Sequence, residues 1–343
     1  MMDIRLEDCS DAMAIRPIYD GPDSQSMFWI AVCLIAGTAM LYFGSEWLVR
    51  GAKGLALHFG IAPFVVGLTV LAFGSSAPEA ITSIVSTETP SLIIGNVVGS
   101  NIANVGLAIG LAAIIGPMAA KYTDMKIELI VMLATAVGLL AMGYFGFIGQ
   151  IEGIALILLL FAFLYYVFRK KGSDEEAQSA YTEDVTPEKL SNPILAVLVI
   201  IGLILLYFGA KYFIEGARDL AVLLGVPDLI IGLIVVAIGT SLPEMCISIL
   251  AAHRGEADMA VANIVGSNIF NIFFVLGIGA ALVDVPVSSS VLTFHLPMML
   301  LFSIVMFLMV RFRNRIDRTS GLVLVGLYCA YIAIIGLYPS LMM

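Results

Sequence analysis

The stretch Gly239-Thr240-Ser241-Leu242-Pro243-Glu244 places a proline and a carboxylate inside an apolar run long enough to cross a bilayer. A near copy, Gly74-Ser75-Ser76-Ala77-Pro78-Glu79, lies in an apolar run upstream. A charged side chain in the hydrocarbon core is costly, and it is usually functional where it occurs. We therefore predict that the two glutamates form the centre of an ion-binding site and that the rest of the chain is its scaffold.

The composition is typical of an all-α polytopic membrane protein. Of the 343 residues, 60% are hydrophobic and 13% are charged, whereas charged residues make up about a quarter of an ordinary soluble domain. The lipid bilayer is therefore the expected surrounding. Ten segments are predicted to be transmembrane helices: 28–44, 62–85, 91–117, 129–147, 151–168, 193–212, 229–252, 259–283, 291–310 and 321–337.

Other features of the composition argue against several functions. The net charge of −9 comes with no basic patch that would indicate a nucleic-acid partner. The cysteines and histidines are scattered and form no CxxC or HExxH pattern. We therefore expect no resident cofactor, no enzymatic activity and no particular protein partner. Residues 1–27 are polar and acidic without an apolar core, so we expect a disordered extension and no cleavable signal peptide.

The chain contains an internal repeat. Tyr42-Phe43-Gly44 matches Tyr207-Phe208-Gly209, and Glu79 matches Glu244 at the same offset of 165 (244 − 79). Each copy holds five predicted spans, so the copies, 28–168 and 193–343, enter the membrane from opposite sides. Such inverted repeats are typical of secondary transporters, whose sites lie near the midplane. The polar segment 169–192 is expected to be a flexible cytoplasmic linker.

The distribution of positive charge predicts the orientation. Of the 17 lysines and arginines, 13 lie in the odd-numbered connections between spans, and 4 (17 − 13) lie in the even-numbered connections and the termini. Positively charged connections tend to stay in the cytoplasm. The prediction is a multi-pass protein of a prokaryotic cytoplasmic (inner) membrane with both termini outside.

The proline in each motif explains why oxygen atoms become available at the membrane centre. Pro243 has no N–H, so the carbonyl of Gly239 loses its helical partner. Backbone groups freed within lipid must be satisfied by something, and a cation can do so. Glu244 adds a negative charge one residue later, and Pro78 with Glu79 repeats the arrangement.

A second repeated motif supplies further oxygens. Gly99-Ser100-Asn101-Ile102-Ala103-Asn104 matches Gly266-Ser267-Asn268-Ile269-Phe270-Asn271. Residues four apart share a helix face, so Ser100 and Asn104 are expected side by side, as are Ser267 and Asn271. The two motifs together offer carboxylates, amides, hydroxyls and carbonyls, which suit Ca²⁺ or Na⁺ and do not suit zinc or copper.

Each feature also has a purely structural interpretation. Small and polar residues on one face of a membrane helix commonly serve helix packing. A proline kink is common in membrane helices, and a lone intramembrane glutamate is also compatible with a protonated, hydrogen-bonded side chain. The joint occurrence of both motifs in both copies favours an ion site.

These motifs resemble the two α-repeats of the Ca²⁺/cation antiporter superfamily, and they are most similar to those of prokaryotic Na⁺/Ca²⁺ exchangers. The resemblance covers nearly the whole chain and implies ten transmembrane helices in two inverted five-helix repeats. It implies that Glu79 and Glu244 are the central Ca²⁺ ligands. The other ligands that it implies are the carbonyls of Ser75 and Thr240, the hydroxyls of Ser76, Ser100, Ser241 and Ser267, and the amides of Asn104 and Asn271.

The chain departs from the family pattern at a few positions. Some relatives carry aspartate at the position of Asn271, so this site holds one potential charge fewer. Ser75 stands where threonine is more usual. The H⁺-coupled branch typically has Asn and Thr before its glutamate, and the absence of that pattern favours Na⁺ coupling. The resulting hypothesis is Ca²⁺/Na⁺ antiport, with a Ca²⁺/H⁺ or K⁺-dependent antiporter and a passive cation channel as alternatives.

Overall fold

A computed structural model describes residues 24–171, 190–225 and 237–341. Most of the predicted extension 1–27, the middle of the predicted linker 169–192 and the beginning of the predicted span 229–252 lie outside the described residues. The described part is almost entirely helical, with two short β pairs.

Within the described ranges, eight helices are long and apolar enough to cross a membrane. Three of them contain π-helical turns, which are included in the bounds. They are α1 (Ser24–Phe59), α5–η5–α6 (Ser91–Ala103, Asn104–Ile109, Gly110–Ile115), α7 (Tyr122–Gly143), α8 (Gln150–Lys171), α10 (Asn192–Leu223), α14–η7–α15 (Ala257–Phe270, Asn271–Leu276, Gly277–Leu282), η8–α16 (Val291–His295, Leu296–Arg313) and α17 (Arg318–Leu337).

The remaining two spans are interrupted helices. The first consists of α2 (Pro63–Val66), η3 (Gly67–Leu71), α3 (Ala72–Ser75) and α4 (Ala77–Val85), and the second ends in α12 (Ala237–Thr240) and α13 (Leu242–His253). Single 3₁₀ turns, η4 (Ser86–Glu88) and η9 (Pro339–Leu341), follow α4 and α17. Together with the eight long helices, these account for the ten spans predicted from the sequence.

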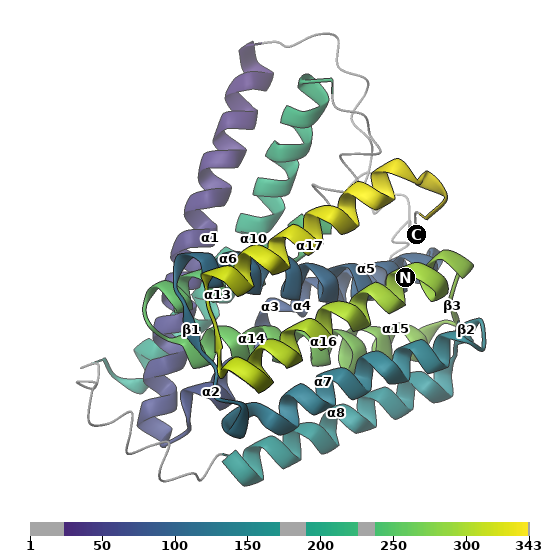
Figure 1. Cartoon of the computed structure of the whole chain (residues 1–343). Coiled ribbons are helices and arrows are strands. Elements are labelled where there is room, and N and C mark those ends of the chain that lie inside the picture. The colour runs from purple at the N-terminus through teal and green to yellow at the C-terminus, as the bar shows by residue number, and fades with distance from the viewer. Residues whose placement is uncertain (1–23, 172–189, 226–236, 342–343) are drawn as a thin grey trace, which may run out of the picture.

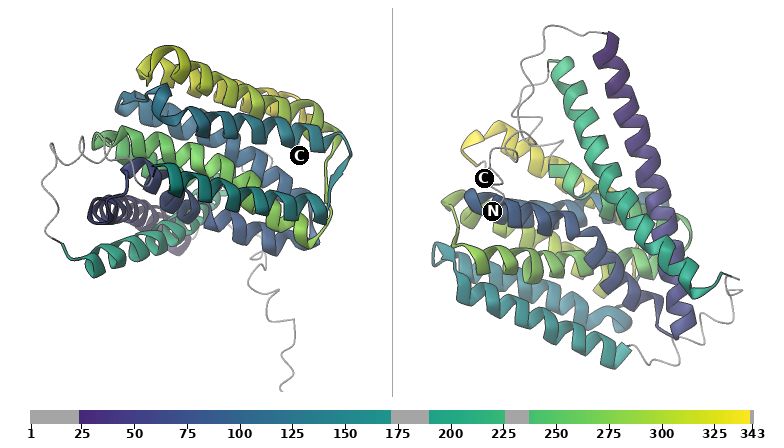
Figure 2. Two further views of the ribbon diagram at one scale, coloured as in Figure 1. Left: turned by 90° about the horizontal axis from the view of Figure 1, so that it is seen from below. Right: turned by 180° about the vertical axis from the view of Figure 1, so that it is seen from behind.

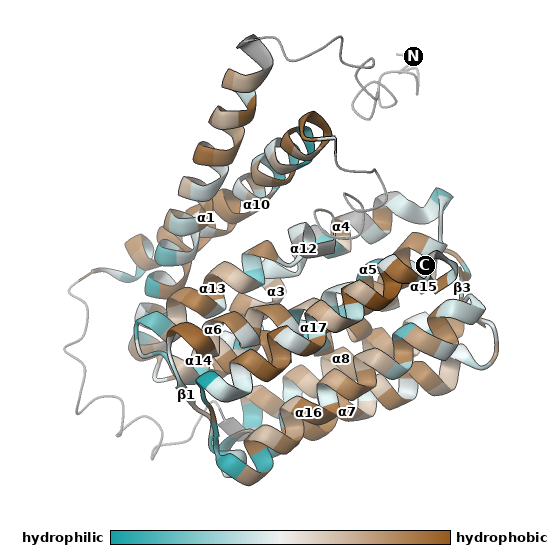
Figure 3. Cartoon of the chain, turned by 45° about the horizontal axis from the view of Figure 1, so that its top comes forward, coloured by the Kyte–Doolittle hydropathy of each residue, from teal (hydrophilic) through white to brown (hydrophobic). Residues whose placement is uncertain are grey.

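The helices form a central bundle and a tilted pair. Figure 1 shows α1 and α10 side by side at a steep angle to the other helices, and Figure 2 shows the same pair from behind. The helices that begin at Ser91 and Ala257 lie at the centre, because 78% and 83% of their apolar windows are buried, against 28–39% in the other six. Hydrophobic residues dominate the helices, and hydrophilic residues gather at their ends and connections (Figure 3), as a surrounding bilayer requires.

The α1–α10 pair is held together by glycines spaced seven residues apart. A Cβ atom at Gly44 would lie 2.9 Å from the backbone nitrogen of Leu206, and one at Gly202 would lie 2.7 Å from that of Leu48. The two backbones are therefore in direct contact, which glycine alone permits. The glycines that share this property, at repeat-related positions, are Gly37, Gly44 and Gly51 in α1 and Gly202, Gly209 and Gly216 in α10.

The predicted end of the first span at residue 44 is wrong, because α1 continues to Phe59 and is 36 residues long. Charged residues after position 44 lower the hydropathy, but they do not interrupt the helix. Glu46 pairs with Arg254, and Lys53 pairs with Glu256. The connection between α13 and α14 therefore supplies partners for charges that the sequence alone places in a loop.

Two antiparallel β pairs join the two halves. β1 (Met118–Ala119) pairs with β4 (Arg315–Ile316), and β2 (Phe147–Ile148) pairs with β3 (Val285–Pro286). Each pair connects a segment of one repeat with a segment of the other. These contacts were not predicted, because two-residue strands leave no periodic signal in a sequence.

Candidate ion-binding site

The two Pro-Glu motifs interrupt their helices in the same way. α3 ends at Ser75, Ser76 has φ −84° and ψ 3°, and the next helix begins at Ala77. In the second copy α12 ends at Thr240, Ser241 has φ −91° and ψ 7°, and α13 begins at Leu242. Proline is the second residue of each new helix, where its missing N–H costs no hydrogen bond. Each glutamate therefore lies in the first turn of a helix that starts inside the protein.

The predicted site residues are buried, except Thr240, which is half-buried, and they meet across the repeats. The Ser76 hydroxyl donates to Glu244 Oε1 over 3.2 Å. The Oγ atoms of Ser75 and Ser267 lie 3.4 Å apart. The repeat-related hydroxyls of Thr240 and Ser100 also lie 3.4 Å apart. The structure thus brings the broken helices of both copies against α5 and α14, at the centre of the molecule (Figure 1).

The site is rich in acceptors and poor in donors. Six buried side-chain oxygens of the predicted residues accept no hydrogen bond from the described part of the chain: both Oε atoms of Glu79, Oε2 of Glu244, Oγ of Ser241 and the Oδ1 atoms of Asn104 and Asn271. Buried polar atoms normally have partners, so such a group of exceptions needs an explanation. A bound cation would supply the missing partner for all of them.

The negative charge of the site comes from the two glutamates. Within the described ranges, no ion pair joins either of them to a lysine or arginine. No group of three or more His, Cys, Asp or Glu side chains is found there either. Among the predicted residues, the oxygen ligands available to a cation are therefore two carboxylates and neutral oxygens.

Two further amides, Asn101 and Asn268, face each other across the repeats. Nδ2 of Asn101 donates to the backbone carbonyl of Asn268 (3.2 Å), and Nδ2 of Asn268 donates to the carbonyl of Asn101 (3.4 Å). Because a carbonyl oxygen accepts only, each side chain must turn its NH₂ group toward the partner's backbone. The Oδ1 atom of each amide is then available to a neighbour.

Asn104 and Asn271 use these two acceptors. Nδ2 of Asn271 donates to Oδ1 of Asn101 (3.0 Å), and Nδ2 of Asn104 donates to Oδ1 of Asn268 (3.1 Å). The NH₂ groups of both predicted ligands are thereby occupied, and their Oδ1 atoms remain without a hydrogen bond. The backbone carbonyls of Asn268 and Asn101 thus orient the side chains of Asn101 and Asn268. Those two side chains in turn hold the NH₂ groups of Asn271 and Asn104, so that both ligands direct their oxygens elsewhere.

A second pair of asparagines contacts the broken helices. Nδ2 of Asn263 lies 3.4 Å from the backbone carbonyl of Glu244 and 3.1 Å from the Ser248 hydroxyl. Nδ2 of Asn96 lies 3.5 Å from the carbonyl of Glu79. Both asparagines therefore fix the helix turns that carry the glutamates.

These four asparagines were missed by the sequence analysis, which assigned them no role. A signal existed, because each occurs in both copies at the offset of 167 (263 − 96 and 268 − 101). Another difference concerns the second motif, where a π-helical segment begins at Asn104 and another at Asn271. A π-helical turn inside an α-helix is often found at a functional site.

Known proteins similar to this chain include sodium/calcium exchangers. The family model described as sodium/calcium exchanger protein matches residues 29–169 and 194–337. The sodium/calcium exchanger MaX1 of Methanosarcina acetivorans is 31% identical, over 88% of this chain and 97% of its own length. The inner membrane protein YrbG of Escherichia coli is 31% identical, over 90% of this chain and 97% of its own length.

A solved structure shares the fold. The sodium–calcium exchanger NCX_Mj, in crystals soaked with zero Na⁺ and Ca²⁺, is similar with a TM-score of 0.77 and 31% identity. The similarity covers 90% of this chain and 99% of the exchanger. The matched residues include both Pro-Glu motifs and both Gly-Ser-Asn motifs. This chain is therefore a membrane protein that belongs to the sodium/calcium exchanger family.

Proposed function

We propose that this protein exchanges Ca²⁺ for Na⁺ by alternating access around a midplane centre that contains Glu79 and Glu244. The group of buried oxygens without hydrogen-bond donors is the observation that carries the proposal. The names of MaX1 and NCX_Mj, both sodium/calcium exchangers, support this choice of ions. Both ions are substrates here, and the proposal requires no resident cofactor.

The proposed ligands are those that the family resemblance implies, and the contacts between the repeats support them. Glu79 and Glu244 neutralise the ion. The hydroxyls of Ser76, Ser100, Ser241 and Ser267 and the amide oxygens of Asn104 and Asn271 complete its coordination, together with carbonyls at Ser75 and Thr240. Oxygen ligands of this kind, with only two formal charges, suit one Ca²⁺ or several Na⁺.

Charge balance explains why such a centre exchanges ions. Two ionised carboxylates without a partner carry a desolvation cost on the order of several kcal/mol per ion. The empty centre therefore resists closure to either side. One Ca²⁺ or several Na⁺ cancel the charge of the two carboxylates. Only the ion-loaded protein therefore switches the centre from one side of the membrane to the other. Obligatory exchange follows, because an ion must leave and another must enter before the next transition.

The orientation proposed from the sequence is retained. The cytoplasmic membrane of a prokaryote is the proposed location, and both termini are placed outside. The inner membrane protein YrbG supports the location by its name. The excess of lysine and arginine in odd-numbered connections supports the orientation.

Uptake of ⁴⁵Ca²⁺ into proteoliposomes tests the proposal. Vesicles loaded with Na⁺ should accumulate Ca²⁺, whereas vesicles loaded with choline should not. Glu79→Gln and Glu244→Gln keep the side-chain volume but remove one charge each, so both should abolish uptake. Glu152→Gln is a matched control, because Glu152 lies at the start of α8 and its Oε2 accepts from Gly149 N.

Each alternative has its own outcome in the same experiment. Uptake driven by a proton gradient without Na⁺ would identify a Ca²⁺/H⁺ antiporter, and a requirement for K⁺ would identify a K⁺-dependent one. Ca²⁺ flux without any counter-ion would identify a channel and contradict the charge argument. Unchanged exchange in either glutamine variant would show that the carboxylates are not ligands.

A further inference from the structure

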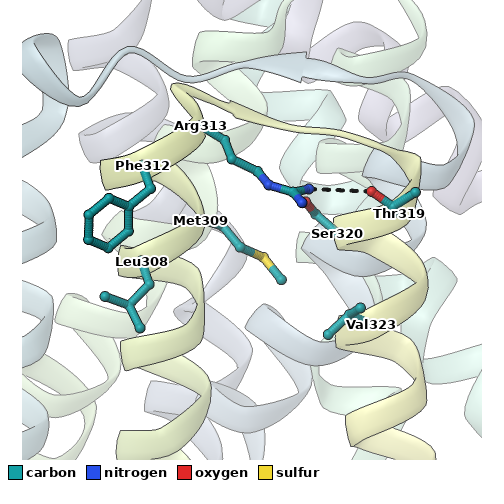
Figure 4. Close-up of a pocket in the computed structure, with 7 residues that line it drawn as sticks. All are labelled: Leu308, Met309, Phe312, Arg313, Thr319, Ser320 and Val323. Atoms are coloured by element: carbon teal, nitrogen blue, oxygen red, sulfur yellow. Dashed lines mark hydrogen bonds between the residues drawn. The ribbon is translucent and has the colours of Figure 1, made fainter.

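A pocket of about 350 Å³ lies between the end of α16 and the beginning of α17, away from the ion site. Figure 4 shows the seven side chains that line it: Leu308, Met309, Phe312, Arg313, Thr319, Ser320 and Val323. All of them come from the last two turns of one helix and the first two turns of the next. The pocket therefore opens at the level where these helices leave the membrane.

The pocket is polar at one end and apolar at the other. Arg313, Thr319 and Ser320 lie beside the connection between the helices, whereas Leu308 and Val323 lie further along the helices (Figure 4). Leu308 and Val323 are 43% and 51% exposed. In a membrane this apolar end faces hydrocarbon, so it is suited to an acyl chain.

The connection carries a strong positive charge. Residues 311–318 read Arg-Phe-Arg-Asn-Arg-Ile-Asp-Arg, with four arginines and one aspartate. Asp317 Oδ1 accepts from Ser320 N (2.9 Å) and from the hydroxyls of Thr319 and Ser320, so it caps α17. Its Oδ2 pairs with Arg313 Nη1 (3.4 Å) and Arg315 Nε (3.6 Å), so one carboxylate is shared between two arginines. The side chains of Arg313 and Arg315 remain 54% and 67% exposed. Two guanidinium groups that share a single carboxylate are therefore more than half exposed beside the pocket.

The backbone of this connection is fixed. Arg315 pairs with Ala119 in the β1–β4 ladder. Asn314 adopts a left-handed conformation with φ 49°, and its side chain accepts from Tyr122 N (2.9 Å). The arginines thus extend from an ordered segment, which lowers the entropic cost of binding.

The repeat provides an internal comparison. The connection between α7 and α8, which corresponds to that between α16 and α17, reads Tyr144-Phe145-Gly146-Phe147-Ile148-Gly149 and contains no lysine or arginine. Its β2–β3 pair has the same architecture as β1–β4. The arginines are therefore not needed to build this connection. Its place on the face assigned to the cytoplasm accounts for an excess of positive charge there, and the feature that distinguishes it further is the pocket beside that charge.

We propose that the α16–α17 pocket binds an anionic phospholipid, with its phosphate on Arg313 and Arg315 and an acyl chain along Leu308, Met309 and Val323. Guanidinium groups form strong charge-assisted hydrogen bonds with phosphate. Basic pockets between transmembrane helices are suited to anionic head groups. A zwitterionic lipid would bring a second positive group next to the arginines, so the charge favours an anionic lipid.

The test uses the purified full-length protein in a neutral detergent. Dioleoyl phosphatidylglycerol should raise the unfolding temperature with a saturable dose response, and native mass spectrometry should detect a retained lipid. Dioleoyl phosphatidylcholine, which has the same chains, and glycerol phosphate, which has none, should do neither. Equal effects of both phospholipids would overturn the proposal, and an equal effect of glycerol phosphate would identify a site for a free phosphate.

Charge variants locate the site. Arg313→Gln with Arg315→Gln should weaken the phosphatidylglycerol response about thirtyfold, if each cation contributes the typical attraction to an anionic lipid. Replacement of both arginines by lysine keeps the two charges and should retain most of the phosphatidylglycerol response. This variant is also the control that the fold tolerates substitution at Arg313 and Arg315. Lys211→Gln with Arg218→Gln, a matched loss of two charges on α10, should leave the response unchanged. An unaltered response in the Arg313/Arg315 glutamine variant would overturn the proposal.

Discussion

At the scale of single residues, the orientation of two side-chain amides decides whether the ion site offers oxygen or NH₂ groups to a cation. Asn104 and Asn271 turn their oxygens away from Asn268 and Asn101 because their NH₂ groups are held there. An amide is useful to a cation only through its oxygen. The proposed ligands therefore depend on neighbours that need not touch an ion.

We predict that Asn101→Leu raises the Ca²⁺ concentration for half-maximal uptake about tenfold, the lower limit for lost outer partners of metal ligands. Without the Oδ1 of Asn101, the amide of Asn271 can rotate and present NH₂. The added change Asn271→Asp should restore affinity, because a carboxylate presents oxygen in either orientation. Proteoliposome uptake measures both. A double variant as weak as Asn101→Leu alone would contradict a positioning role.

At the scale of elements, prolines determine where helices start inside the protein, and glycines determine how closely two helices pack. Pro78 and Pro243 are the second residues of new helices that start inside the protein, and Glu79 and Glu244 follow them in the first turns. Glycines perform a different task in α1 and α10, where they allow two helices to touch backbone to backbone. Both devices are repeated in the two copies.

The glycine contact predicts a specific cost. In Gly202→Ala the new methyl group would lie 2.7 Å from Leu48 N and 2.8 Å from Gly44 O, so the helices must separate. Overpacking of this kind costs about 1–3 kcal/mol of unfolding free energy. Gly138→Ala in α7 is the control, since nothing lies within 4 Å of its Cβ position, and it should be neutral or stabilising. Equal unfolding temperatures for both variants would contradict the close contact.

The cap of α17 predicts a dependence on acid pH. Hydrogen bonds from Thr319 and Ser320 hold the pKa of Asp317 well below its ordinary value of 3.8. Because folding lowers this pKa, the carboxylate stabilises the protein above the ordinary value, and the effect is lost as the pH falls toward the folded pKa. The difference in unfolding temperature between the wild type and Asp317→Asn should therefore shrink from pH 6 to pH 3. Parallel curves would contradict the cap.

At the scale of the whole molecule, the inverted repeat sets which ends of the helices share a face. Tyr122 N donates to Asn314, so the start of α7 and the end of α16 lie together. Ser289, just before η8, lies at the opposite end of that span. The arginines around residue 315 therefore share a face with the start of α7.

This arrangement predicts the result of labelling in intact cells. In a variant without its native cysteines, Ser289→Cys should react with a membrane-impermeant maleimide added outside. Thr123→Cys should react only after the cells are opened, because it lies on the basic face that we assign to the cytoplasm. Both positions are exposed, so burial does not limit either reaction. The reverse pattern would invert the proposed orientation.

The sequence by itself predicted the ten helices and the repeat, and the resemblance of its motifs to a known family supplied the ten proposed ligands. Apolar length, proline position and a repeated offset are local properties that remain visible without coordinates. The full length of α1 was not visible, because Glu46 and Lys53 find their partners about two hundred residues away, at Arg254 and Glu256.

Only the tertiary structure decided how the ligands are oriented. Hydrogen bonds between Asn101, Asn268 and the two ligand amides depend on how α5 and α14 cross, and that geometry belongs to two helices from different repeats. The pocket at Arg313 also needs two helices and a β pair to exist. A sequence specifies which groups are present near the membrane centre, whereas packing between distant segments determines which atoms of those groups face one another.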